Sequence, residues 1–129
     1  MKIYLASPLF TENEKRNVDD YAAHLRHLGH EVYVPMEHQI EDAWSMPNAV
    51  WAKKVFVTDV EEIKKCDKVI CLYYGLYSDS GTAWECGFAY GIGKPVELVD
   101  RSGEECSLMV VNGAENAFEF YHKRRKIGL

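Results

Sequence analysis

The chain lacks the long apolar runs, cysteine motifs and positive charge that mark several classes of protein. No apolar stretch approaches the roughly 20 residues that a membrane-spanning helix requires, so no membrane association is expected. The four cysteines form no C-x-x-C pair and have no zinc-ligand spacing with histidine, so no metal site is expected. The net charge of −5 argues against binding to a nucleic acid polymer. These features predict a reduced, cytoplasmic protein.

Glycine-rich nucleotide-binding loops are also missing. No G-x-G-x-x-G follows the first apolar segment, where a dinucleotide-binding domain would carry it. The sequence GIGKP at 91–95 contains the residues of a phosphate-binding loop, but it falls at the end of a predicted helix instead of its beginning. No cofactor is therefore expected.

What is present is a regular alternation of strand and helix patterns. A capping box formed by Thr11 and Glu14 opens a helix that ends at Gly29. The C-terminal part is harder to interpret, with a short helix near 104–110 and a further strand around Phe118–Tyr121. The pattern predicts one α/β domain over residues 1–129, flavodoxin-like and doubly wound, with a mainly parallel four- to five-stranded sheet flanked by helices. The other predicted strands are 2–6, 31–35, 68–74 and 95–99, and the other predicted helices are 48–65 and about 81–91.

Glu85 is an isolated carboxylate in a run of small, aromatic and glycine residues. It lies about one turn into the third predicted helix, just past the loop that leaves the central strand. Ligands of doubly wound sheets bind at the carboxyl ends of the strands, and Gly81 and Thr82 at the helix start would allow a ligand to come close. Glu85 is equally compatible with a helix-surface position or with a buried carboxylate paired with a tyrosine. The residues alone leave these alternatives open.

Three segments carry a family resemblance: YLASPLFT near the N-terminus, TDVEEIKKCD at 58–67, and DSGTAWECGFAYGIGKPV at 79–96. Together they resemble the nucleoside 2-deoxyribosyltransferase family, from Lys2 to about Asn116. The most specific element is the pattern D-x-G-x-x-x-E-x-G-x-A that begins at Asp79 and contains Glu85. The order and spacing of the segments carry the resemblance more than any single motif.

The resemblance implies a catalytic set. Glu85 would be the nucleophile that attacks the anomeric carbon of a 2-deoxyribosyl group, and Tyr4 would hydrogen-bond to it. Asp59 would exchange a proton with the nucleobase. The substrates would be a deoxynucleoside and a free nucleobase. Without the resemblance, Asp59 is one more acid on a helix and Tyr4 is an ordinary strand tyrosine.

The resemblance also implies residues that bind the substrate. Asp79 would contact the sugar hydroxyls, although an Asp at this position is just as typical of a helix N-cap. Gly81 would leave room for the ligand beside it. Phe10 would form an apolar wall against the base, or else a core contact, and Gln39 would face the edge of the base.

A final segment implies assembly. Ser107, Met109 and Asn112 align with a stretch that the transferases donate to the site of a neighbouring subunit, so we expect a homodimer or a higher homo-oligomer. The transferases usually have Asn where Ser107 stands, and Asn112 is an alternative if the loop is shifted. Relatives that hydrolyse nucleoside 5′-monophosphates use Ser at this position.

Two other functions stay open at this point. One is an N-glycoside hydrolase of (deoxy)nucleosides or nucleoside 5′-monophosphates, in which water replaces the acceptor base. The other is a non-catalytic nucleoside- or nucleotide-binding domain on the same scaffold, because a fold alone does not define a function. The carboxylate of Asp79 disfavours a 5′-phosphate nearby, whereas Ser107 favours one.

Overall fold

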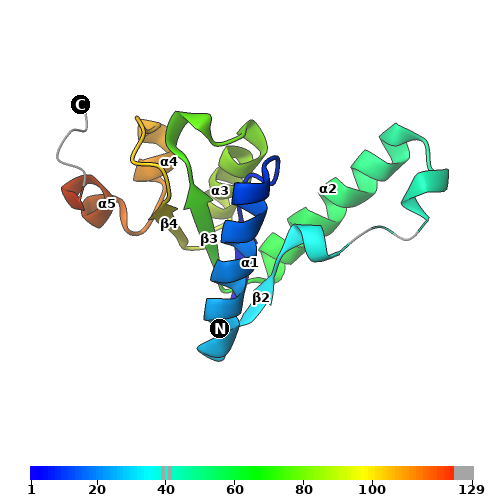
Figure 1. The fold of residues 1–129 in the computed structure, drawn as a ribbon, viewed down its shortest axis with the longest axis horizontal. Helices are drawn as coiled ribbons and strands as arrows, with labels where there is room; N and C mark the ends of the chain where they lie inside the picture. The colour runs from blue at the N-terminus through cyan, green and yellow to red at the C-terminus, as the bar shows by residue number, and fades with distance from the viewer. Residues whose placement is uncertain (39, 41, 124–129) are drawn as a thin grey trace.

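A parallel four-stranded sheet forms the centre of the protein. The computed structural model describes residues 1–38, 40 and 42–123. The strands follow the order β2-β1-β3-β4 (Figure 1), and their bounds are β1 Lys2–Ala6, β2 Glu31–Tyr33, β3 Lys68–Tyr73 and β4 Val96–Asp100. All neighbouring pairs are parallel. This is the doubly wound, flavodoxin-like arrangement that the sequence predicts. The order in which successive strands are added to the sheet reverses between β1 and β3.

Helices cover both faces of the sheet (Figure 1). Helix α1 packs on one face, and α2, α3, α4 and α5 contribute to the core on the other. The predicted capping box of α1 is confirmed, because the Glu14 amide donates to Thr11 Oγ1 at 3.1 Å and Glu14 Oε1 accepts from the Thr11 amide at 2.9 Å. The bounds are α1 Glu12–His27, α2 Asn48–Lys65, α3 Ser80–Gly91, α4 Leu108–Asn112 and α5 Ala117–Lys123, with short 3-10 turns at Pro35–Glu37, Ala43–Ser45 and Gly75–Tyr77.

The alternation of side chains along the strands divides the core into two layers. In β1, Ile3 and Leu5 face α1, whereas Tyr4 and Ala6 face α2 and α3. This follows from the period of two along a strand, which sends successive side chains to opposite faces. Because both faces are covered, β3 is almost entirely apolar, and each of its fully buried large side chains stabilises the fold by about 1.5–3 kcal/mol.

The prediction of a strand around Phe118–Tyr121 is wrong, because these residues belong to α5. Phe118 and Phe120 alternate as they would in a strand, but on the helix Phe120 is buried while Phe118 is 70% exposed. The side chain of Asn116 occupies the edge of β4 instead. Its Oδ1 accepts from the Leu98 amide at 2.9 Å and its Nδ2 donates to the Leu98 carbonyl at 2.8 Å. A fifth strand there would have to displace these contacts.

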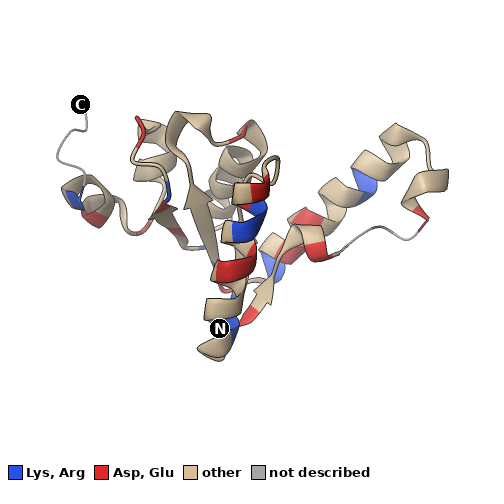
Figure 2. Ribbon diagram, viewed as in Figure 1, with Lys and Arg blue, Asp and Glu red and all other residues tan. Residues whose placement is uncertain are grey.

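Helix α2 extends well beyond the sheet, with the turn Ala43–Ser45 near its outer end (Figure 1). The charged residues in the outer half of the helix are Lys53 and Lys54, whereas its acidic residues lie nearer the sheet (Figure 2). The outer half and the turn Ala43–Ser45 expose several large apolar side chains. Trp44 is 88% exposed. The others are Val50, Trp51, Phe56 and Val57. Within residues 1–38, 40 and 42–123, no helix has the length and apolar character to cross a membrane.

Candidate active site

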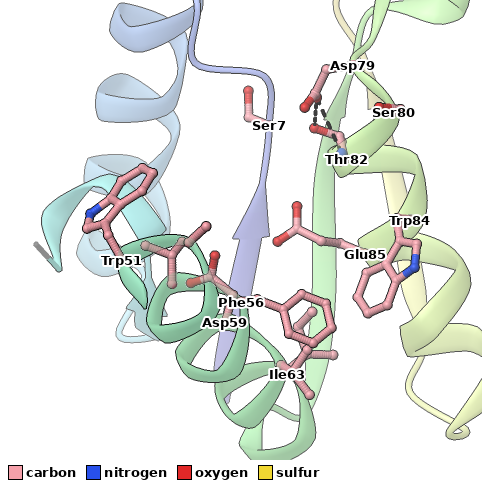
Figure 3. Close-up of a pocket in the computed structure, with 14 residues that line it drawn as sticks. Ser7, Trp51, Phe56, Asp59, Ile63, Asp79, Ser80, Thr82, Trp84 and Glu85 are labelled. Atoms are coloured by element: carbon pink, nitrogen blue, oxygen red, sulfur yellow. Dashed lines mark hydrogen bonds between the residues drawn. The ribbon is translucent and has the colours of Figure 1, made fainter. Parts of the chain in front are cut away.

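The turn after β3 places Glu85 beside the carboxyl end of the sheet. The chain turns through Gly75, which has φ of 68° and packs so closely on the next loop that a Cβ would lie 2.6 Å from the Glu105 carbonyl oxygen. It then reaches Asp79, the N-cap of α3. Glu85 follows after somewhat more than one helical turn and projects toward β1 (Figure 3).

A cavity of about 570 Å³ lies between α2 and α3. Figure 3 shows the carboxylates of Asp59, from α2, and Glu85, from α3, on either side of β1, with Ser7 and Asp79 near the strand ends. The size suits a small ligand, and the mixture of apolar walls with a few carboxylates is typical of a binding site. The apolar wall includes Trp51, Val55, Phe56, Ile63 and Trp84.

Tyr4 holds the Glu85 carboxylate. Its hydroxyl donates a hydrogen bond to Glu85 Oε2. Burial raises the pKa of Glu85 from 4.5 to about 7; the bond from Tyr4 lowers it, and the charges of Asp59 and Asp79 add to the rise. Burial, together with the charge of Glu85, raises the pKa of Tyr4 far above its ordinary range, so the phenol stays protonated and serves as the donor.

Asp59 is the second carboxylate with an altered acidity. Burial raises its pKa, while a hydrogen bond from the Tyr33 hydroxyl to Asp59 Oδ1, at 3.3 Å, and the nearby His38 lower it. Asp59 and Glu85 also interact electrostatically. The charge of Asp59 thus contributes to the raised pKa of Glu85, and burial raises the pKa of both carboxyl groups in this cavity.

Asp79 has both of the properties that the sequence left open. It is the N-cap of α3, where its Oδ1 accepts from the Thr82 amide at 3.3 Å and from the Thr82 hydroxyl. It also lines the cavity together with Gly81. A Cβ at residue 81 would lie 2.9 Å from Asp79 Oδ2, so glycine allows the carboxylate to hold this orientation.

A second cavity, of about 670 Å³, adjoins the first. The two share Ser7, Trp51, Val55, Asp59 and Asp79, so together they provide space for a ligand with two parts, such as a sugar and a base. Phe10 lines the second cavity but is 77% exposed, so it lies at the edge and not within a closed wall. Gln39, the predicted contact to the base edge, lies outside the described residues.

Ser107, Met109 and Asn112 lie apart from Glu85. Ser107 is the N-cap of α4, and its amide donates to the Tyr73 hydroxyl at 2.9 Å. Met109 and Asn112 line a third cavity, of about 400 Å³, between α3 and α4. Within one chain, therefore, the structure brings together Glu85, Asp59, Tyr4, Asp79 and Gly81 but not these three residues.

Sequence reasoning missed Tyr33 and His38. The Tyr33 ring stacks on Tyr4 with a centroid distance of 5.5 Å, and His38 stacks on the other side of Tyr33 at 4.4 Å. The available signal was that KIYLA and EVYVP each carry a tyrosine in third position. It also missed Phe56, whose ring centroid lies 5.3 Å from that of Trp84, the apolar neighbour of Glu85 that the sequence does suggest for excluding water. In the described ranges, no group of three or more His, Cys, Asp or Glu is placed to hold a metal ion.

A tyrosine-held carboxylate and a second carboxylate, at the carboxyl ends of a doubly wound sheet, are an arrangement suited to glycosidic-bond chemistry. The family model for nucleoside 2-deoxyribosyltransferase matches residues 3–117. The chain belongs to this family and is an enzyme of this type.

Individual relatives agree with the family match. The structure of the 2-deoxyribosyltransferase from the psychrotolerant bacterium Bacillus psychrosaccharolyticus superposes with a TM-score of 0.82 at 35% identity, over 99% of this chain and 93% of that one. A nucleoside deoxyribosyltransferase of Limosilactobacillus fermentum is 28% identical over 92% of this chain and 79% of its own length.

Two further relatives match a smaller share of this chain. The Clostridium botulinum CMP N-glycosidase BcmB has a TM-score of 0.53 at 28% identity, over 76% of this chain and 67% of that one. The methionine–tRNA ligase of Clostridium acetobutylicum is 27% identical over 84 residues, and the chain spans 13% of its length.

Proposed function

We propose that the protein transfers a 2-deoxyribosyl group between nucleobases through a covalent glycosyl intermediate on Glu85, with net retention. The observation that carries this proposal is the Glu85 carboxylate, which accepts a hydrogen bond from Tyr4 in a cavity that also contains Asp59. Its substrates are a deoxynucleoside and a free nucleobase, as the family membership supports.

In the first half-reaction, a Glu85 carboxylate oxygen forms a bond to C1′ of the deoxyribosyl group while the bond from C1′ to the base nitrogen breaks. The oxocarbenium-like transition state carries positive charge, which the carboxylate stabilises and then captures. The departing base takes its proton from Asp59. Tyr4 keeps one oxygen of Glu85 fixed, so that the other is available to the sugar.

In the second half-reaction, a nitrogen of the acceptor base attacks C1′ and the ester bond to Glu85 breaks. The acceptor gives its proton to Asp59, which restores the starting state. The ester must survive while the bases exchange, so water must be kept from C1′. The rings of Phe56 and Trp84 line the cavity beside Glu85 and are suited to exclude it.

Asp79, at the N-terminus of α3, is proposed to bind the sugar hydroxyls. A carboxylate about 4 Å from a phosphate dianion would cost on the order of 1–4 kcal/mol, so a 5′-hydroxyl suits this position better than a 5′-phosphate. We also expect 2′-deoxyribose to be preferred over ribose, because a 2′-hydroxyl withdraws electrons from the oxocarbenium-like state.

The test is chromatography of the products from deoxyinosine and cytosine. Transfer predicts deoxycytidine and hypoxanthine in equal amounts. Glu85→Gln should lower turnover at least about a thousandfold, because it removes both the covalent route and the stabilising charge. Glu105→Gln, at an exposed loop carboxylate, is a matched control that should keep full activity. A Glu85→Gln protein that retains more than a tenth of its activity would show that Glu85 is not the nucleophile.

Hydrolysis is the second candidate, and it is favoured by the structural likeness to the CMP N-glycosidase. Here water would attack C1′ in place of an acceptor base. The same assay with a 5′-phosphorylated donor separates the two functions. Release of free base that does not depend on acceptor, or a much higher rate with the 5′-monophosphate, would favour the hydrolase over the transferase.

We further propose that the active form is at least a homodimer, in which Ser107, Met109 and Asn112 complete the pocket of a neighbouring subunit. Two observations support this: Met109 is 78% exposed, and Trp51 on the projecting half of α2 and Trp44 in the turn Ala43–Ser45 are exposed as well. Uncovered apolar surface of this kind marks protein interfaces. Light scattering at the assay concentration tests the proposal, and a fully active monomer would refute it.

A cytoplasmic location is proposed from the cysteines. All four are free thiols, and three of them are buried in the core. Reduced cysteines in this number are typical of proteins that fold in a reducing compartment.

A further inference from the structure

Two neighbouring strands each end near a tyrosine that holds one of the two carboxylates. Tyr4 of β1 and Tyr33 of β2 are paired in register, and their rings stack at 5.5 Å with an angle of 21° between planes. Tyr4 donates to Glu85 of α3, and Tyr33 donates to Asp59 of α2. The sheet thus fixes the spacing between two hydroxyl donors, and each donor fixes one carboxylate.

We propose that Tyr33 is a positioning residue that orients Asp59 for proton exchange with the nucleobase. This inference rests on the proposed function. Tyr33 is buried and is not among the residues that line either cavity at the site, so it acts through Asp59 and does not touch the substrate. Its hydroxyl donates to Asp59 Oδ1. Among the described residues, none donates a hydrogen bond to the other carboxylate oxygen, Asp59 Oδ2, which leaves that oxygen available to the base.

The Tyr33 ring has little freedom to move. It lies between Tyr4 and the ring of His38, which stacks on its outer side at 4.4 Å with an angle of 11°. Stacking on both rings restricts the Tyr33 ring and thereby keeps its hydroxyl oxygen next to Asp59 Oδ1. The cost of ordering Asp59 is therefore met when the protein folds and not during each turnover.

The hydroxyl of Tyr33 also affects the charge of Asp59. Burial raises the pKa of Asp59, and the hydrogen bond from Tyr33 is the largest effect that lowers it. Removing this donor should therefore move the Asp59 titration to higher pH. The groups that surround Asp59 and remain in place are Tyr4 from β1, Glu85 from α3, His38 after the turn Pro35–Glu37, and Glu62 on α2 itself.

The test uses Tyr33→Phe, which keeps the stacked ring and removes only the hydroxyl. Tyr74→Phe is the matched control, because the Tyr74 hydroxyl accepts from Asn17 Nδ2 at 2.7 Å in the other core layer. Carboxyl carbons of aspartate are titrated by NMR in the ligand-free protein, with Asp59→Asn to assign the signal. Transfer between deoxyinosine and cytosine is measured in parallel, as kcat and KM over a range of pH.

Tyr33→Phe should raise the pKa of Asp59 by about one pH unit and lower kcat by about tenfold, with KM within about twofold of wild type. The alkaline limb of kcat/KM should move up with the titration. Tyr74→Phe should change none of these quantities. An unchanged titration with unchanged kcat would overturn the proposal, and so would a rise in KM alone, which would make Tyr33 a substrate-binding residue.

The two readouts separate this inference from the proposed function. If the wild-type protein shows no transfer, the proposed function fails, while the NMR titration still decides whether Tyr33 controls Asp59. If the wild-type protein transfers deoxyribose and the pKa of Asp59 is the same in wild type and Tyr33→Phe, the proposed function stands and this inference fails.

Discussion

Glu85→Gln should make the protein more stable at alkaline pH while it abolishes activity. The pKa of this carboxyl is 4.5 in its ordinary state and about 7 in the folded protein. Folding therefore favours the protonated form, and the ionised form is penalised. The substitution by glutamine removes the charge but keeps a carbonyl oxygen that accepts from Tyr4.

The sign and size follow from linkage. A carboxyl whose pKa is raised on folding contributes full stability below its unfolded pKa and loses it as the pH rises through its folded pKa. Each pKa unit corresponds to about 1.4 kcal/mol, so a rise from 4.5 to about 7 costs about 3 kcal/mol above pH 8. Glu85 keeps some contact with solvent, and we expect a net gain of about 2 kcal/mol for the variant.

The assay is urea unfolding of wild type and Glu85→Gln at pH 5 and pH 8. The free energy of unfolding in urea should be about 2 kcal/mol higher for the variant at pH 8, and this gain should shrink below about 1 kcal/mol at pH 5; in thermal unfolding at pH 8 the melting temperature should be higher by roughly 6–10 °C. Glu105→Gln, on an exposed loop, should show no such pH dependence. If Glu85→Gln is no more stable than wild type at pH 8, the reasoning from burial of this carboxylate is refuted.

Three other outcomes are expected. On its acid limb, below about pH 7, the value of kcat/KM for transfer should rise about tenfold per pH unit, because Glu85 attacks only when ionised, and at higher pH it should fall again as Asp59 loses the proton that it gives to the base; a flat profile from pH 5 to pH 7 would contradict this. Asp59→Asn should slow both half-reactions and leave deoxyribosyl ester on Glu85, visible by intact-protein mass spectrometry with a deoxynucleoside and no acceptor; the absence of an adduct in both this variant and wild type would argue against a covalent route. Asn116→Ala should destabilise the protein by about 1–3 kcal/mol in urea unfolding, because it removes two hydrogen bonds to the edge of β4; a loss below about 0.5 kcal/mol would show that water replaces them.

The features that could be predicted from the sequence are those set by local spacing. The period of each segment, the capping box at Thr11 and the near-continuous apolar run of β3 fixed the order of strands and helices, because these signals act within a few residues. Asp79, Gly81 and Glu85 are brought together in the same way, since they occupy the first turns of one helix. The sequence also predicted Tyr4 and Asp59, but only by the family resemblance.

The tertiary structure decided what depends on residues far apart in the chain. The alternation of Phe118 and Phe120 fits a strand as well as a helix, and only the Asn116 side chain on the edge of β4 excludes the strand. The role of Tyr33 arises from its register with Tyr4 and from the distance to Asp59, twenty-six positions further along the chain. Such contacts exist only after the sheet has formed, because pairing between distant segments is set by the packing of the whole domain and not by any local propensity.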